Sequence, residues 1–293
     1  MARKTAAAAL LLAVLPLAGP AESRQNERRY AVSGMVLRVD AATRTFFVSH
    51  QRVDGLMDAM TMPFEVRDVH QLQGVVPGAL VDFVLVITKE AGYATDLRAR
   101  RYESVEPDPP TPLRLALLRR ATGPVPAPVA LGAPVPNFTL TDSTGQRVKL
   151  SSFAGKVVAI NFVYTRCALP QFCLRMTNTF GVLQKRFASV LGRDAQLLTV
   201  TFDPERDTPE VLAAYATRWN ADPRRWRFLT GSVEEVGRAC ALFGVESFPD
   251  EGLLNHMVRT VIVGRDGRLL ANIEGNRFTP EQLGDLLRST LEA

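Results

Sequence analysis

The chain has 293 residues, of which 46% are hydrophobic and 22% charged, an ordinary composition for soluble globular protein and a length sufficient for two domains. The formal net charge is only +5, and no block of Lys and Arg is interleaved with aromatic residues, so we predict no nucleic-acid binding. Two of the three cysteines stand six residues apart, which makes their surroundings the first place to look for chemistry.

Residues 1–25 have the pattern of a secretory signal. Arg3 and Lys4 form a charged start, residues 6–17 an apolar run, and residues 19–21 a small-residue cleavage site. We therefore expect export to the periplasm. The apolar run is shorter than the roughly 20 residues that span a bilayer, so an uncleaved membrane anchor is the second choice. No cysteine precedes Cys167, so we expect no lipidated cysteine after the signal.

Residues 30–103 are predicted to form a small all-β domain. The segments that alternate or run apolar between turn signals are 32–39, 45–50, 62–66, 80–88 and 93–101. Five short strands in succession predict an OB-like five-stranded barrel.

A methionine cluster lies within this domain. Met57, Met60 and Met62 supply three of the seven methionines within six residues, and His50 ends the preceding predicted strand. Residues two apart on a strand share a face, so Met60 and Met62 should point the same way. Thioether sulfur is a soft ligand that selects Cu(I), and an imidazole completes a plausible site. The alternative is that the methionines only fill the core.

The segment 59–64, Ala-Met-Thr-Met-Pro-Phe, resembles the CusF-like periplasmic copper-binding domain. The resemblance implies that His50, Met60 and Met62 hold Cu(I). This sequence departs from the family in two ways: Met57 occupies the position of the family's tryptophan, and the interval from His50 to Met60 is about one residue shorter. Met57 is therefore either a further ligand or a packing residue.

Residues 104–133 are predicted to be a linker. Nine of the nineteen prolines fall between Pro107 and Pro136, a density that prevents a regular fold and favours extended polyproline stretches. The exception is segment 113–120, which combines leucines with arginines and could form two helical turns. Docking on one domain is our first interpretation of this segment, and contact with a membrane surface is the alternative.

Residues 134–293 alternate strands with helices and end on a hairpin and a helix, which predicts an α/β fold of thioredoxin type. Cys167 follows a buried strand, and Pro170 suits the first turn of the next helix. That leaves Cys167 in the loop and Cys173 in or near the first helical turn, where the helix dipole would favour a thiolate. A structural disulfide between the two cysteines is the alternative.

Two other residues need an interpretation. Cys240 lies on the apolar stripe of a predicted helix, 232–243, and should be a core residue without chemistry. His256 lies in a predicted loop before the strand 259–263, which in a thioredoxin-type fold approaches the cysteine loop from the side.

Residues 134–293 resemble the Sco/SenC family of thioredoxin-like copper proteins. The residues that carry the resemblance are the segments 164–167 and 202–210, Cys173, and Asn255-His256 ahead of segment 261–267. The resemblance implies that Cys167, Cys173 and His256 bind one copper, and that the protein helps to assemble the CuA centre of cytochrome c oxidase. The family spaces its cysteines Cys-x3-Cys, whereas here five residues intervene.

We therefore predict a periplasmic copper metallochaperone, not an enzyme, carrying Cu(I) and also Cu(II). Its expected partners are a copper-receiving client such as cytochrome c oxidase subunit II and a thiol-disulfide reductant. One alternative is a thiol-disulfide oxidoreductase in which Cys167 and Cys173 are the redox-active pair and act on cysteines of a copper-site client. The other is a copper sequestration or resistance protein without a client.

Overall fold

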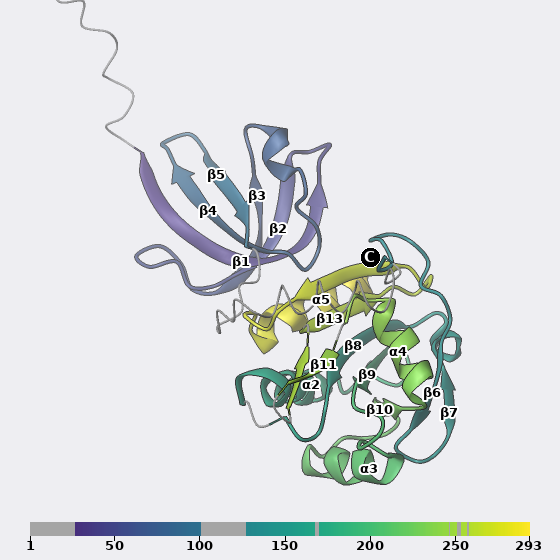
Figure 1. Ribbon diagram of the computed structural model, residues 1–293. Helices are drawn as coiled ribbons and strands as arrows, with labels where there is room; N and C mark the ends of the chain where they lie inside the picture. Colours follow the sequence, from purple (N-terminus) through teal and green to yellow (C-terminus); the bar gives the residue numbers. More distant parts are fainter. Residues whose placement is uncertain (1–26, 101–126, 168–169, 246, 251–252, 257) are drawn as a thin grey trace, which may run out of the picture.

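A computed structural model describes residues 27–100, 127–167, 170–245, 247–250, 253–256 and 258–293 (Figure 1). The predicted signal, most of the predicted linker and its segment 113–120 lie outside these residues. Among the described helices, none is long and apolar enough to cross a membrane.

The N-terminal part is an antiparallel sheet with the strand order β3-β2-β1-β4-β5. Its elements are β1 (Arg28–Asp40), β2 (Thr45–His50), β3 (Met60–Glu65), the short 3₁₀ helix η1 (Val69–Leu72), β4 (Leu80–Ile87) and β5 (Gly92–Ala99). A parallel bridge between Val66 and Ala94 joins the two outer strands, so the sheet curls into a barrel. The predicted all-β domain is confirmed.

Three phenylalanine rings fill the barrel. Phe64 and Phe83 meet edge to face with ring centroids 4.8 Å apart, and Phe46 meets Phe83 in the same way at 5.4 Å. All three are buried. Edge-to-face packing of this kind fixes the relative positions of β2, β3 and β4, and hence of the side chains at the ends of β2 and β3.

The C-terminal part is a seven-stranded mixed sheet with the order β14-β13-β8-β9-β10-β6-β7. Its elements are β6 (Thr139–Asp142), β7 (Arg147–Lys149), η2 (Leu150–Phe153), β8 (Val157–Val163), the π-helical turn η3 (Pro170–Leu174), α2 (Arg175–Arg186), β9 (Ala195–Thr201), α3 (Pro209–Arg218), β10 (Trp226–Thr230), α4 (Val233–Ala241), β11 (Ser247–Asp250), β12 (Leu253–His256), β13 (Arg259–Val263), β14 (Leu269–Glu274) and α5 (Pro280–Glu292).

The central strands of this sheet show why the sequence reads as α/β. β8, β9 and β10 run parallel, and every residue of β8 and β9 is buried. Parallel strands covered by helices on both faces are rich in apolar residues, and β8 is apolar apart from Asn161, whereas β9 interleaves its apolar residues with buried Gln196, Thr199 and Thr201. The predicted thioredoxin-like fold class is confirmed.

The start of α3 is not the one that its sequence suggests. Asp207 with Glu210 three residues on has the spacing of a capping pair, but the N-cap is Thr208, whose hydroxyl accepts a hydrogen bond from the Val211 amide at 3.4 Å. Asp207 is fully buried and turns towards the loop after β8. A residue that looks like a local cap has therefore been used for a long-range contact.

The barrel packs against α5 (Figure 1). The Asp285 carboxylate accepts hydrogen bonds from Ser49 Oγ at 2.7 Å and from Thr61 Oγ1 at 3.2 Å. The Gln282 side-chain amide donates to the Ser49 carbonyl at 3.0 Å. Met35 and Leu37 of β1 belong to the apolar core of the C-terminal part. The two parts therefore share a packed interface in addition to the linker that joins them.

Candidate metal sites

The barrel brings the predicted copper ligands together at the paired ends of β2 and β3. His50 lies directly opposite Met60 in the antiparallel ladder, and Val48 lies opposite Met62. Met60 and Met62 share one face of β3, as predicted from their spacing. Met60 is 51% exposed and Met62 half-buried, so this group of side chains is open to solvent on one side.

The His50 ring has one nitrogen available for a metal. Its Nδ1 lies 2.7 Å from the Gln51 carbonyl oxygen, which can only accept, so we assign the proton to Nδ1. Nε2 then carries a lone pair. It is buried and has no hydrogen-bond partner among the described residues. Metal-binding histidines commonly donate their second N–H to a carbonyl in this way, so the orphaned Nε2 fits a ligand of a soft cation.

The backbone of Met57 forms an isolated antiparallel bridge with that of Val53, and the half-buried Met57 side chain packs against the barrel core. This contact fits the packing role that was one of the two predictions for this residue. His50, Met60 and Met62 therefore remain the stronger candidate set.

The two cysteines lie at the end of β8, where the chain turns into α2. The Cys167 amide donates to the Tyr164 carbonyl at 3.3 Å, which closes a turn directly after the strand. Cys173 lies in the π-helical turn η3, before the first residue of α2. Both side chains are buried, and all three cysteines of the chain are thiols here. A π-helical turn is wider than an α-helical one, which suits a loop that must bring Cys173 back to Cys167.

The protonation of Cys173 differs from the prediction. A hydrogen bond with Cys167 and burial raise the pKa of the Cys173 thiol, although the helix dipole was expected to favour its thiolate. The dipole prediction is wrong because the neighbouring sulfur of Cys167 and burial both disfavour loss of the Cys173 proton. A metal must therefore displace that proton to bind.

Asp207 anchors the loop between β8 and Cys167. Its carboxylate accepts hydrogen bonds from the Thr165 amide at 3.0 Å, from Thr165 Oγ1 at 2.5 Å and from Thr201 Oγ1 at 2.6 Å. Beside it, Asp203 accepts from the Arg166 guanidinium at 2.8 Å. Sequence reasoning gave neither carboxylate a role at the cysteine site, although both lie in segment 202–210.

The other side of the pair is held by α3 and by the loop before α5. Thr177 Oγ1 donates to the Cys173 carbonyl at 2.8 Å and lies 3.1 Å from the Tyr215 hydroxyl. The Asn276 amide donates to the Gln171 carbonyl. With contacts on both sides, the loop can keep its two sulfurs together without a metal.

His256 lies on a hairpin instead of the predicted loop. β12 pairs with β11, and Ser247 is opposite His256. The position of the His256 side chain lies outside the described part of the structure. β13 runs antiparallel to β8, so the chain enters β13 at the sheet edge from which Cys167 leaves β8. This topology is compatible with the predicted ligand role, which stays a prediction.

Two further observations bear on the sites. Cys240 is buried in α4, and burial raises the pKa of its thiol to about 12, which agrees with the predicted core role. Among the described residues, no group of three His, Cys, Asp or Glu side chains could hold a metal ion. The candidate set of the barrel relies on methionine sulfur, and the His256 side chain lies outside the described residues.

Residues 131–292, more than half of the chain, match the SCO1/SenC family. The chain belongs to the SCO1/SenC family. Residues 29–99 match a second family, the copper binding periplasmic protein CusF. Both predicted resemblances are confirmed, and copper is the metal named for the family matched by the barrel.

Two curated relatives and one solved structure illustrate what this SCO1/SenC protein is similar to. An SCO1 protein homolog of Bacillus subtilis is 29% identical over 147 residues, which are 49% of this chain and 75% of the relative. A putative copper-binding protein of Stutzerimonas stutzeri is 27% identical over 47% of this chain and 68% of the relative. The crystal structure of yeast Sco1 with copper bound is 26% identical, with a TM-score of 0.47 over 57% of this chain and 90% of that one.

The match to a human mitochondrial SCO1 homolog covers only 46% of that protein, and the match to a fission yeast Sco1 covers 59%. This chain therefore spans about half to three quarters of the length of these curated relatives.

Proposed function

We propose that this protein is an exported copper metallochaperone that carries copper on Cys167, Cys173 and His256 and delivers it for assembly of the CuA centre of cytochrome c oxidase. In this proposal residues 1–25 direct the chain to the periplasm, residues 104–133 link the two domains, and the barrel captures Cu(I) through His50, Met60 and Met62. The observation that carries the proposal is the contact between the two sulfurs in a loop anchored from both sides.

The donor sets fit the task of carrying and releasing copper. Two thiolates and one imidazole hold copper in low coordination, which leaves room for a ligand of the receiving protein to enter. The same donor set suits zinc, which favours a fourth ligand. Copper is favoured here because the barrel adds thioethers, which zinc does not use, and because the CusF family is described as copper binding.

The disulfide chemistry of the alternative is less well supported. An attacking cysteine needs a lowered pKa and access to solvent, as in other reactive thiols. Cys173 has a raised pKa and is 1% exposed, and Cys167 is 8% exposed. The raised pKa and the burial count against Cys173 as the attacking thiol in this state. Metal binding needs the same loss of protons, so it is the match to two copper-binding families that favours the metal role. A reductant remains a necessary partner, since an oxidised pair has no thiolate to offer.

Copper titration of the reduced full chain tests the proposal. The double variant Cys167→Ser with Cys173→Ser should lose the copper bound by the C-terminal domain, and circular dichroism should show an unchanged fold. Cys240→Ser is the matched control, because it removes a buried sulfur far from the loop in sequence, and its copper stoichiometry should stay at the wild-type value.

Delivery is tested by mixing the copper-loaded chain with the apo soluble domain of cytochrome c oxidase subunit II and recording the CuA absorption. The expected result is a CuA spectrum with wild type and with Cys240→Ser, and none with the double variant. A double variant that still binds copper tightly in the C-terminal domain would refute the ligand assignment. A loaded protein that never yields a CuA spectrum would favour the sequestration alternative.

A further inference from the structure

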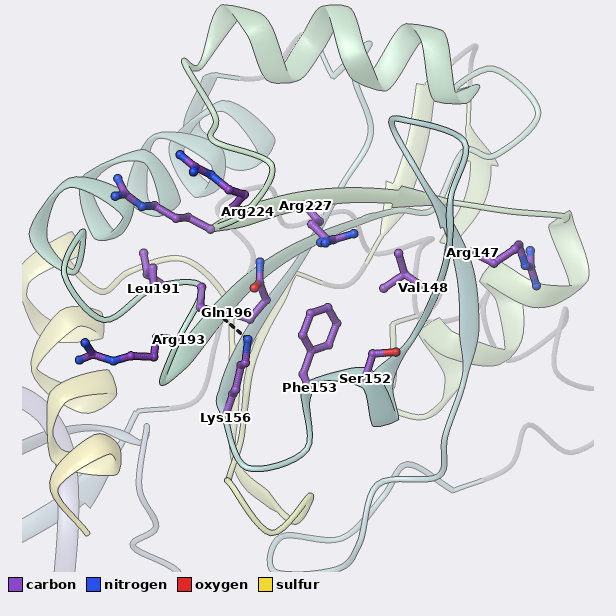
Figure 2. Close-up of a pocket in the computed structure, with 12 residues that line it drawn as sticks. Arg147, Val148, Ser152, Phe153, Lys156, Leu191, Arg193, Gln196, Arg224 and Arg227 are labelled. Carbon is purple, nitrogen blue, oxygen red and sulfur yellow. Dashed lines mark hydrogen bonds between the residues drawn. The ribbon is translucent and has the colours of Figure 1, made fainter.

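A cavity of about 650 Å³ opens at one end of the central strands, the end opposite to the one that carries the cysteines (Figure 2). It is formed where the parallel strands β8, β9 and β10 begin, whereas Cys167 follows the end of β8. Six of its lining side chains are cationic and none is acidic. The cationic residues are Arg147, Lys156, Arg193, Arg224, Arg225 and Arg227. Without sulfur, imidazole or carboxylate in its walls, the cavity is not a metal site.

Positive charge is in excess around this cavity. Four carboxylates pair with five of the six cationic side chains: Asp142, Asp194, Asp222 and Glu235. Asp222 is shared by Arg224 at 3.2 Å and Arg225 at 3.5 Å. Lys156 pairs with no carboxylate among the residues that the structure describes, and its Nζ donates to the Gly192 carbonyl at 2.6 Å.

Unused donors converge at the centre of the cavity. Figure 2 shows Lys156, Gln196 and Arg227 together in the middle, while Arg147 points away. One guanidinium NH group of Arg227 donates to Asp142 at 2.8 Å, but its Nε is buried and has no partner within the described part of the chain. The Gln196 side chain is 2% exposed, and the hydrogen bond that its amide makes with a described residue is a long one, 3.4 Å to the Leu197 carbonyl. Buried donors of this kind normally have an acceptor.

We propose that this cavity binds a phosphate group, either free or carried by a lipid headgroup. A phosphate brings several acceptor oxygens and up to two negative charges, which match the excess of positive charge and the unused donors. Guanidinium groups fit phosphate oxygens with two parallel hydrogen bonds, and lysine adds a point charge. The apolar walls at Val148, Phe153 and Leu191 strengthen these interactions by keeping water away from them.

The proposal is tested on the full chain by titration calorimetry with inorganic pyrophosphate and by sedimentation with vesicles of phosphatidylglycerol or of phosphatidylcholine alone. The variants are Lys156→Gln, which removes the unpaired charge, and Arg225→Gln, which removes a loosely paired one and spares the Lys156 contact with the turn before β9. The control is Arg52→Gln, which removes an exposed charge of the barrel.

We expect binding to pyrophosphate, to phosphatidylglycerol vesicles or to both, weakened about tenfold or more by each cavity variant and unchanged by the control. Binding to pyrophosphate alone identifies a free phosphate, and binding to the vesicles alone identifies a headgroup. Absence of binding to both probes at millimolar phosphate overturns the proposal. Equal weakening by Arg52→Gln, or no weakening by either cavity variant, also overturns it, because the attraction would then be a property of the overall charge.

Discussion

One carboxylate, Asp285, should carry much of the free energy that docks the barrel on α5. It accepts hydrogen bonds from Ser49 and Thr61 of the barrel and pairs with Arg186 of its own domain. Hydrogen bonds to charged groups contribute about 1.5–3 kcal/mol each. Because Thr61 is exposed, its bond should contribute less, so we expect Asp285→Ala to lower the free energy of unfolding by about 2–4 kcal/mol.

A double-mutant cycle isolates the contact across the interface. Ser49→Ala, Asp285→Ala and their combination are compared by urea unfolding of the full chain, followed by circular dichroism. Ser49 is buried, so the coupling between the two changes should reach about 1.5–3 kcal/mol. Glu292→Gln, at the exposed end of the same helix, is the control and should change stability by less than about 0.5 kcal/mol.

The reasoning is refuted if the two single effects add to within about 0.5 kcal/mol in the double variant. Additivity would mean that Ser49 and Asp285 do not touch in solution. Docking of the barrel would then rest on the remaining contacts, which are the hydrogen bond from Gln282 to the Ser49 carbonyl and the packing of Met35 and Leu37.

Three other predictions follow from the sites and the surface. Replacing Met60 and Met62 by Ile keeps the apolar bulk, so stability should change by less than about 1.5 kcal/mol while Cu(I) binding by the barrel is lost; unchanged Cu(I) affinity would make the methionines packing residues. Oxidising Cys167 and Cys173 to a disulfide should abolish copper binding by the C-terminal domain until a reductant is added, and equal binding by the oxidised protein would contradict joint ligation. A hydrogen bond and ion pair with an arginine hold the pKa of Glu235 at about 2, below its usual 4.5, so this carboxylate stabilises the fold above pH 4.5. That contribution should fade between about pH 4.5 and 2 in acid unfolding curves, less steeply in Glu235→Gln.

The sequence was sufficient for most of what depends on local pattern, although the β11–β12 hairpin was predicted as a loop. Alternation and apolar runs place the strands of both domains, and a spacing of two residues puts Met60 and Met62 on one face. The likeness of short segments to two families supplied the metal. These features can be predicted because strand period, turn type and motif spacing depend only on residues that are close together in the sequence.

What the sequence could not show depends on partners far away in the chain. Asp207 has the sequence context of a helix start, yet its carboxylate accepts a hydrogen bond from Thr165, 42 residues before it in the chain. The bond between Ser49 and Asp285 joins residues 236 positions apart. The pKa of Cys173 was misjudged for a similar reason, because the hydrogen bond with Cys167 and the burial that raise it come from the folded loop.

A continuous set of contacts runs from the barrel to the cysteine loop. The Ser49 carbonyl, next to the barrel's candidate histidine, accepts from Gln282 in the first turn of α5. Just before that helix, the Phe278 carbonyl accepts from Arg175 at 3.1 Å, and Arg175 lies two residues after Cys173. The docked barrel and the cysteine loop therefore both contact the start of α5. This arrangement favours copper transfer within one chain over transfer between chains.

Copper loaded on the barrel should accordingly move to the reduced C-terminal domain. Thioethers bind Cu(I) as neutral ligands, whereas paired thiolates add negative charge, so the free-energy gradient should run towards Cys167 and Cys173. In the intact chain the transfer rate should be independent of protein concentration, because the domains are held together. Asp285→Ala should slow the transfer, and cutting the linker near Pro124 in that variant should make the rate concentration-dependent. Stopped-flow mixing with Cu(I) at several protein concentrations measures this. Copper that stays on the barrel after the thiols are reduced, or an intact chain whose rate rises with its own concentration, would show that the barrel scavenges copper separately and does not pass it to the cysteines of the same molecule.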